Sequence, residues 1–264
     1  MGCRDTQRTR GKKGGKEIDL KEVLAKARID DSAKDIRIET LDDFGLGGVD
    51  CKICGNTGRI LTKNGIYLFT RECECMKKRR SLRTIRKSGI SDMLERYTLD
   101  NYETPDEKRE RIKKIAESYV NADSGWFFIA GRSGSGKSHI CTAICKELIE
   151  KGYELTYMLW RDESVALKSC VTEEEYQRKI QKLKDTPVLY IDDFWKGNVT
   201  DADINLTFEI LNARYIDSKK RTVISTEKLL PEIISRDEAI GSRIFERSRG
   251  YSVQAPNENW RLRS

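Results

Sequence analysis

The chain has 264 residues and a formal net charge of +7, with 35% charged and 38% hydrophobic residues. This length suits one large domain or a medium domain with a small one, and the composition is polar but still sufficient for a hydrophobic core. No apolar run reaches about 18 residues and the charged start does not match a secretory signal, so we expect a cytoplasmic protein with no membrane partner. The positive net charge fits either a nucleic-acid partner or a solvated basic surface.

The first 50 residues are predicted to form a basic disordered arm and a linker. Residues 1–16 are rich in Gly, Lys and Arg, and the charged stretch after them ends in a Gly-rich segment. Residues 51–90 are predicted to be a small module with a hairpin and a basic helix. The hairpin is centred on Asn64-Gly65, because both residues tolerate positive φ and short apolar runs flank them. The basic helix covers Met76–Lys87.

Four of the eight cysteines cluster in this module. Their spacing is C-x₂-C, then 18 residues, then C-x-C, and the predicted hairpin brings the two pairs together. Four thiolates suit a tetrahedral structural Zn²⁺ site, and the lack of an export signal argues against disulfides. We therefore predict zinc at Cys51, Cys54, Cys73 and Cys75, the alternative being four thiols without a metal.

Residues 91–264 are predicted to form one α/β domain. Thr104-Pro105-Asp106-Glu107 fits a capping box with proline at the first helical position. After this helix, short apolar strands alternate with helices, which predicts a parallel sheet with helices on both faces. The expected strands are Trp126–Ala130, Leu155–Trp160, Val188–Ile191, Thr222–Ser225 and Ser252–Ala255, and the expected helices begin near Lys137, Thr172 and Ala202.

A phosphate-binding motif follows the first of these strands. Residues 131–138 match G-x-x-x-x-G-K-[ST] in full, between an apolar strand and a helix, which makes a chance Gly-Ser loop a weak alternative. The glycines let backbone N–H groups and the helix N-terminus surround phosphate oxygens, Lys137 reaches the β- and γ-phosphates, and Ser138 ligates Mg²⁺. The sequence thus predicts ATP with Mg²⁺, bound by Gly131, Arg132, Ser133, Gly134, Ser135, Gly136, Lys137, Ser138 and His139.

A second motif supports the same chemistry. The apolar strand Val188–Ile191 leads directly into two aspartates. P-loop proteins place a metal-coordinating aspartate at the end of such a strand, so Asp192 is expected to hold Mg²⁺. Asp193 is positioned to act as a general base that orients the attacking water, the alternative being that it only caps the turn.

Several segments taken together resemble one family. They are Cys54–Gly58, Glu95–Tyr102, Val188–Gly197, Phe208–Tyr215, Ile224–Glu227 and Glu238–Arg247. This set is similar to the DnaI-type and phage DnaC-like helicase loaders, which are AAA+ ATPases related to the IstB-type transposition ATPases. The resemblance covers about residues 51–264 and implies a P-loop AAA+ core, preceded by a small zinc-binding module.

What the resemblance implies is an ATP-dependent loader that delivers a hexameric replicative helicase onto single-stranded DNA. ATP lies between neighbouring subunits in such proteins, which implies self-association and an arginine finger, here Arg243 or otherwise Arg247. Thr226 falls at the sensor position. Only 21 residues follow Arg243, too few for a helical lid, so we expect slow, partner-stimulated hydrolysis. DNA contacts are expected in Lys77–Lys87 and Ser164–Lys184, and helicase contacts in the N-terminal arm and module.

Three other functions remain open from the sequence. An IstB-like ATPase would assist transposition on duplex DNA, although the cysteine module argues against it. A small-molecule P-loop kinase would need a lid and an acceptor pocket, for which the sequence has no signature. A nucleotide-gated adaptor without meaningful hydrolysis would share the ATP site.

Overall fold

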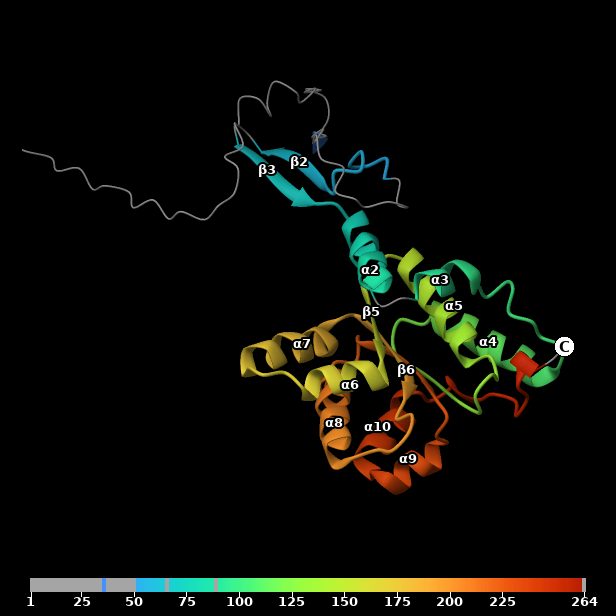
Figure 1. The fold of residues 1–264 in the computed structure, drawn as a ribbon. Helices are drawn as coiled ribbons and strands as arrows, with labels where there is room; N and C mark the ends of the chain where they lie inside the picture. Colours follow the sequence, from blue (N-terminus) through green and yellow to red (C-terminus); the bar gives the residue numbers. More distant parts are fainter. Residues whose placement is uncertain (1–34, 37–50, 65–66, 88–89, 263–264) are drawn as a thin grey trace, which may run out of the picture. The chain divides into compact units, whose positions relative to one another are not determined.

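The computed structural model describes residues 35–36, 51–64, 67–87 and 90–262 (Figure 1). The chain divides into two compact units, residues 1–73 and 74–264. Nearly all of the predicted basic arm, residues 1–50, lies outside the described residues. No helix among the described residues combines the length and the apolar character needed to cross a bilayer.

The N-terminal unit contains a three-stranded antiparallel sheet. Its strands, in the order β1-β2-β3, are β1 (Asp35–Ile36), β2 (Arg59–Asn64) and β3 (Tyr67–Glu72). The β2–β3 pair is the hairpin that the sequence predicts. Its centre is displaced by one residue, because Asn64 pairs with Tyr67 and so belongs to the strand rather than to the turn.

The C-terminal unit alternates helices and strands as the sequence predicts. Its elements are α2 (Cys75–Lys87), α3 (Ser91–Arg96), α4 (Glu107–Asn121), β4 (Trp126–Ala130), α5 (Lys137–Glu150), β5 (Leu155–Leu159), α6 (Trp160–Lys168), α7 (Glu173–Asp185), β6 (Val188–Phe194), α8 (Asp201–Ile216), β7 (Arg221–Thr226), α9 (Leu230–Arg236), α10 (Glu238–Arg247), β8 (Ser252–Gln254) and the 3₁₀ helix η1 (Trp260–Leu262).

These strands form one parallel sheet in the order β5-β6-β7-β4-β8. Alternate residues of each strand face opposite sides, so each face has its own core. Phe127 and Tyr190 pack with α4 and α5 on one face, whereas Phe128 and Ile191 pack with α6, α8 and α10 on the other. Figure 1 shows α3, α4 and α5 gathered on one side of β5 and β6, with α6, α7 and α8 on the other. The predicted doubly covered sheet is confirmed.

Some local predictions are wrong in detail. Helix α4 is capped by Asp106, whose side chain accepts from the backbone N–H of Arg109, and not by Thr104. Strand β5 ends at Leu159 because Trp160 already begins α6, a helix that the sequence analysis did not separate from the following segment. The cap at Thr172 is as expected, since its side chain accepts from the N–H of Glu175.

The basic helix α2 lies in the C-terminal unit, whereas the sequence grouped it with the cysteine module in residues 51–90. Ser81 Oγ donates to the carbonyl of Tyr153 and accepts from the N–H of Leu155, which attaches α2 to the edge strand β5. An ion pair of 3.0 Å between Arg80 and Glu154 adds to this contact. The boundary between the units therefore falls at residues 73/74 and not at 90/91.

Candidate nucleotide site and cysteine cluster

The P-loop connects β4 to α5, and its conformation depends on glycine. Gly134 and Gly136 have φ values of +75° and +91°, which side chains with a Cβ rarely adopt. A Cβ on Gly134 would collide with the side chain of Asn259, and one on Gly136 would lie 3.3 Å from Nη1 of Arg109. Helix α5 has no side-chain cap at Gly136, so its first N–H groups are available to an anion.

Lys137 lies across this loop. Its Nζ donates to the carbonyl oxygens of Gly131 at 2.8 Å and Arg132 at 2.9 Å. Burial lowers the pKa of Lys137, while the charges of Glu227, Asp193 and Asp192 raise it to a smaller extent. The ammonium is therefore partly desolvated and held by neutral carbonyls, which a phosphate can replace as acceptors.

Asp192 is fixed at the end of β6 by donors only. Its Oδ1 accepts from the backbone N–H of Asp193 at 3.1 Å and from the Ser225 hydroxyl, and its Oδ2 accepts from the Tyr157 hydroxyl at 3.1 Å. The residue is 6% exposed. Hydrogen bonds from donors stabilise a carboxylate, and the negative charge of Asp192 adds to burial in raising the pKa of Tyr157. Such an acid suits a divalent cation.

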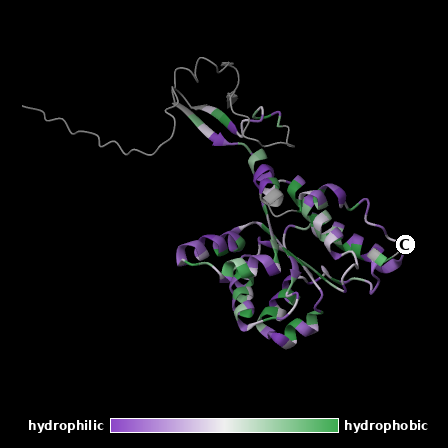
Figure 2. Ribbon diagram, in the orientation of Figure 1, coloured by the Kyte–Doolittle hydropathy of each residue, from purple (hydrophilic) through white to green (hydrophobic). Residues whose placement is uncertain are grey.

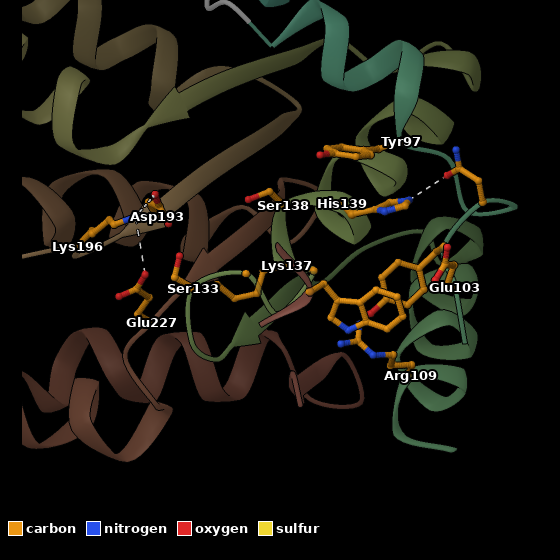
Figure 3. A pocket seen from close by; sticks show the side chains of 15 residues that line it. Tyr97, Glu103, Arg109, Ser133, Lys137, Ser138, His139, Asp193, Lys196 and Glu227 are labelled. Carbon is orange, nitrogen blue, oxygen red and sulfur yellow. Dashed lines mark hydrogen bonds and ion pairs between the residues drawn. The ribbon is translucent and has the colours of Figure 1, made fainter. Parts of the chain in front are cut away.

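The charged side chains of Asp193, Lys196 and Glu227 interact in a row beside Asp192. Lys196 Nζ lies 2.8 Å from Oδ2 of Asp193 and 3.7 Å from Oε1 of Glu227. Figure 3 shows these three residues together on one side of Lys137 and Ser138. Thr226, the predicted sensor, is fully buried, and its hydroxyl donates to the carbonyl of Phe194. From the end of β7, the side chain that lines the cavity is thus Glu227.

Aromatic side chains lie at the opposite end of the site (Figure 3). His139 stacks on Tyr97 with ring centroids 4.5 Å apart, and its Nε2 lies 2.9 Å from Oδ1 of Asn101. Burial lowers the pKa of His139, which keeps its ring neutral at neutral pH. The guanidinium of Arg109 lies 4.2 Å from the ring centroid of Trp260, whose backbone N–H donates to the carbonyl of Gly134 at 2.9 Å.

A cavity of about 270 Å³ joins the two ends. It is lined by Tyr97, Asn101, Tyr102, Glu103, Arg109, Ser133, Gly134, Gly136, Lys137, Ser138, His139, Asp193, Lys196, Glu227 and Trp260. The sequence analysis named the P-loop residues, His139 and Asp193 among these. It did not name the other lining residues as site residues. Lys196 and Glu227 are close in sequence to Asp193 and Thr226, and Tyr97, Asn101 and Tyr102 fall in the segment Glu95–Tyr102 noted for its family resemblance, whereas Glu103, Arg109 and Trp260 lie outside all of these segments.

The two predicted arginine fingers lie on α10, and neither lines this cavity. Arg243 donates to Oδ1 of Asn212 at 3.1 Å, and its guanidinium lies 4.9 Å from the ring centroid of Phe208. Arg247 donates to the carbonyl of Ser218 at 2.8 Å. Their role as fingers stays a prediction, and it requires a second subunit, since neither side chain reaches the nucleotide cavity of its own chain.

The cysteine cluster has the arrangement of a metal site. The sulfur atoms of Cys51, Cys54, Cys73 and Cys75 all lie within 4.8 Å of one another. Those of Cys51 and Cys73 are 3.7 Å apart, close to the roughly 3.8 Å expected between two sulfurs of a tetrahedral site with Zn–S of about 2.3 Å. The N–H of Gly58 donates to Sγ of Cys54 at 3.3 Å, a contact that favours a thiolate. The cluster therefore fits zinc.

Comparison with known proteins assigns the family. The family model described as "IstB-like ATP binding protein" matches residues 65–264. The chain belongs to this family. It is 30% identical over 228 residues to the protein YqaM of Bacillus subtilis, covering 80% of the chain and 69% of YqaM. It is 26% identical over 186 residues to the replicative helicase loader DnaC of Escherichia coli, covering 68% of the chain and 72% of DnaC.

The solved structure of DnaI has the same core fold as this chain. The two match with a TM-score of 0.52 and 20% identity, over 62% of this chain and 92% of DnaI. The predicted fold class and the resemblance to DnaC-like and IstB-like proteins are thus confirmed. The chain is an ATP-binding AAA+ ATPase, and the cavity between the P-loop and the aromatic residues is the candidate site for its nucleotide.

Proposed function

We propose that this ATPase loads a hexameric replicative helicase onto single-stranded DNA during the initiation of DNA replication. The observation that carries the proposal is the similarity to the helicase loader DnaC over 72% of that protein's length. An IstB-like role in transposition is the second candidate, and the description of the family model favours it. A small-molecule kinase is a poorer fit, because the relatives described above are an IstB-like ATP-binding family and a helicase loader.

In the proposed cycle, Mg²⁺ would be held by the hydroxyl of Ser138 and the carboxylate of Asp192. Once bound, the ion would neutralise charge on the β- and γ-phosphates. Asp193 orients the attacking water. Zinc at the four cysteines stabilises the N-terminal module, which has too few residues for a core of its own.

The arginine finger is proposed to act between subunits. Helix α8 presents Phe208, 38% exposed, and Tyr215 against the guanidinium of Arg243 on α10, and α10 also exposes Phe245. Exposed aromatic side chains next to an arginine are typical of protein interfaces. If a neighbouring subunit covers this surface, Arg243 would reach the nucleotide bound by that neighbour. If Arg243 stays on Phe208, Arg247 would take this role.

Single-stranded DNA is proposed to bind near α6 and α7. Helix α7 is largely hydrophilic on the side seen in Figure 2. Its Arg178 and Lys182 are exposed and form no ion pair with another described residue. Val171 is 93% exposed in the segment between the two helices. In helix α2, Lys77 and Arg83 are exposed and available to DNA, whereas Arg79 is buried.

The test is a mixing experiment with the replicative helicase of the same cell. Light-scattering chromatography with ATP and Mg²⁺ would compare wild type, Lys137→Ala and the control Lys219→Ala, whose side chain is exposed and does not line the cavity. The proposal expects a defined complex that places helicase on single-stranded DNA for wild type and control only. ATP-dependent assembly on duplex DNA, with no helicase complex, would instead support the transposition role.

A further inference from the structure

The end of β6 and the turn that follows it have an unusual backbone, with an irregular register between Ile191 and Phe194. Asp193 and Trp195 have φ values of +52° and +55°, in the left-handed region that residues other than glycine seldom occupy. Trp195 anchors this turn, because its Nε1 donates to Oγ1 of Thr207 at 2.9 Å and the residue is 2% exposed. The N–H of Lys196 then donates to the carbonyl of Asp193 at 3.0 Å. Strain of this kind is often retained where it positions a functional group.

The group that this turn positions is the ammonium of Lys196. It is brought back over the carboxylate of Asp193 at 2.8 Å, with Glu227 on its other side at 3.7 Å. All three residues line the nucleotide cavity at the end that holds Lys137 and Ser138. The hydrogen bond to Asp193 raises the pKa of Lys196, so the side chain is a stable cation.

The charge at this end of the cavity needs such a cation. Asp193 and Glu227 bring two carboxylates to the end of the cavity beside the P-loop, and the buried carboxylate of Asp192 accepts from the N–H of Asp193 next to them. A carboxylate beside a phosphate repels it unless a positive charge lies between them. Lys137 is engaged by the P-loop on the opposite side. Lys196 is the second lysine that lines the cavity, and its side chain is 43% exposed, which leaves it free to change partners.

We propose that Lys196 is a second phosphate-binding lysine. When ATP binds, the ammonium of Lys196 moves from Asp193 to the γ-phosphate, and Glu227 keeps the lysine side chain at the site. ATP but not ADP then breaks the Lys196–Asp193 ion pair. The freed carboxylate of Asp193 can accept a hydrogen bond from the attacking water. In the arrangement drawn in Figure 3, the ammonium of Lys196 occupies this carboxylate, so the same ion pair would keep Asp193 from the attacking water until ATP displaces it. The inference rests on the ATPase activity of the family and not on helicase loading.

The experiment measures nucleotide preference in the absence of any helicase. Calorimetry with Mg²⁺ would give the affinities for ADP and for the non-hydrolysable ATP analogue AMPPCP. The variants are Lys196→Met, Lys196→Arg and the control Lys219→Met. We expect Lys196→Met to weaken AMPPCP by about tenfold, equivalent to about 1.4 kcal/mol, with ADP unchanged. Lys196→Arg keeps the preference, because the charge remains.

Two further outcomes separate this role from simpler ones. If Lys196→Met lowers kcat but leaves the ratio of the two affinities unchanged, Lys196 only positions Asp193 and the proposal fails. If both nucleotides weaken equally, the lysine acts through the general field of the site, which also overturns it.

Discussion

Replacement of Trp260 by alanine tests whether the C-terminal segment is part of the nucleotide site. The indole packs on the guanidinium of Arg109 at 4.2 Å and lines the cavity opposite the phosphate end. Because the P-loop holds the phosphates, the base of ATP is expected among the aromatic residues at this end. Arg109 is 2% exposed, and its buried Nη2 has no hydrogen-bond partner among the described residues, which leaves the N–H groups of this nitrogen for the sugar or base.

The magnitude follows from these contacts. Stacking of a base on an aromatic side chain contributes about 1–3 kcal/mol. A cation–π contact contributes about 0.5–2 kcal/mol, and its loss would leave Arg109 less well oriented. Trp260→Ala should therefore weaken ATP and ADP alike, by about 10- to 100-fold, since about 1.4 kcal/mol corresponds to a factor of ten.

The assay is titration calorimetry with both nucleotides, accompanied by thermal unfolding. Trp260→Phe retains a ring and should lose much less affinity, and Leu262→Ala is the matched control, because Leu262 is 79% exposed and does not line the cavity. If Trp260→Ala binds both nucleotides within twofold of wild type, the C-terminal segment does not contact the base, and the reasoning is wrong. This result would differ from that for Lys196, where only the γ-phosphate is affected.

Three other predictions concern stability and metal content. Arg214 is fully buried and donates to the carbonyls of Leu183 and Thr186. Each acceptor left without a donor costs roughly 1–3 kcal/mol, so Arg214→Met should lower the free energy of unfolding in urea by at least about 3 kcal/mol. The exposed control Arg178→Met should change it little, and a loss below about 1 kcal/mol for Arg214→Met would contradict the reasoning. Burial lowers the pKa of His139 in the folded protein, so below about pH 6.5 the unfolded chain binds a proton at this histidine more readily and the folded state loses stability. The Tm of His139→Gln should therefore drop less than that of wild type between about pH 7.5 and pH 5.5. Equal drops would show that His139 does not cause the effect. The purified protein should release about one zinc ion per chain when a mercurial reagent is added. Cys54→Ser should release almost none, and the control Cys170→Ser should release as much as wild type. If the wild-type protein contains no zinc, the four cysteines are not a zinc site.

The sequence by itself determined the chemistry of the phosphate end. Consecutive residues form the P-loop, and its cradle is made of backbone groups whose geometry depends on local glycines, so a motif of eight residues is sufficient to predict it. The same holds for Asp192, because an apolar strand that ends in an acid is a local pattern. The alternation of strands and helices likewise predicted the doubly covered parallel sheet.

Only the tertiary structure decided the other end of the site and the charges around the γ-phosphate. Arg109 and Trp260 are 151 positions apart, and they meet because β8 lies beside β4 and carries the C-terminus past the P-loop. Glu227 reaches the cavity while its neighbour Thr226 is buried, since successive residues at the end of a strand face opposite sides. Lys196 meets Asp193 through a left-handed turn that no local propensity favours, and the packing of Trp195 maintains it. Contacts of this kind depend on packing between distant segments, which sequence periodicity does not encode.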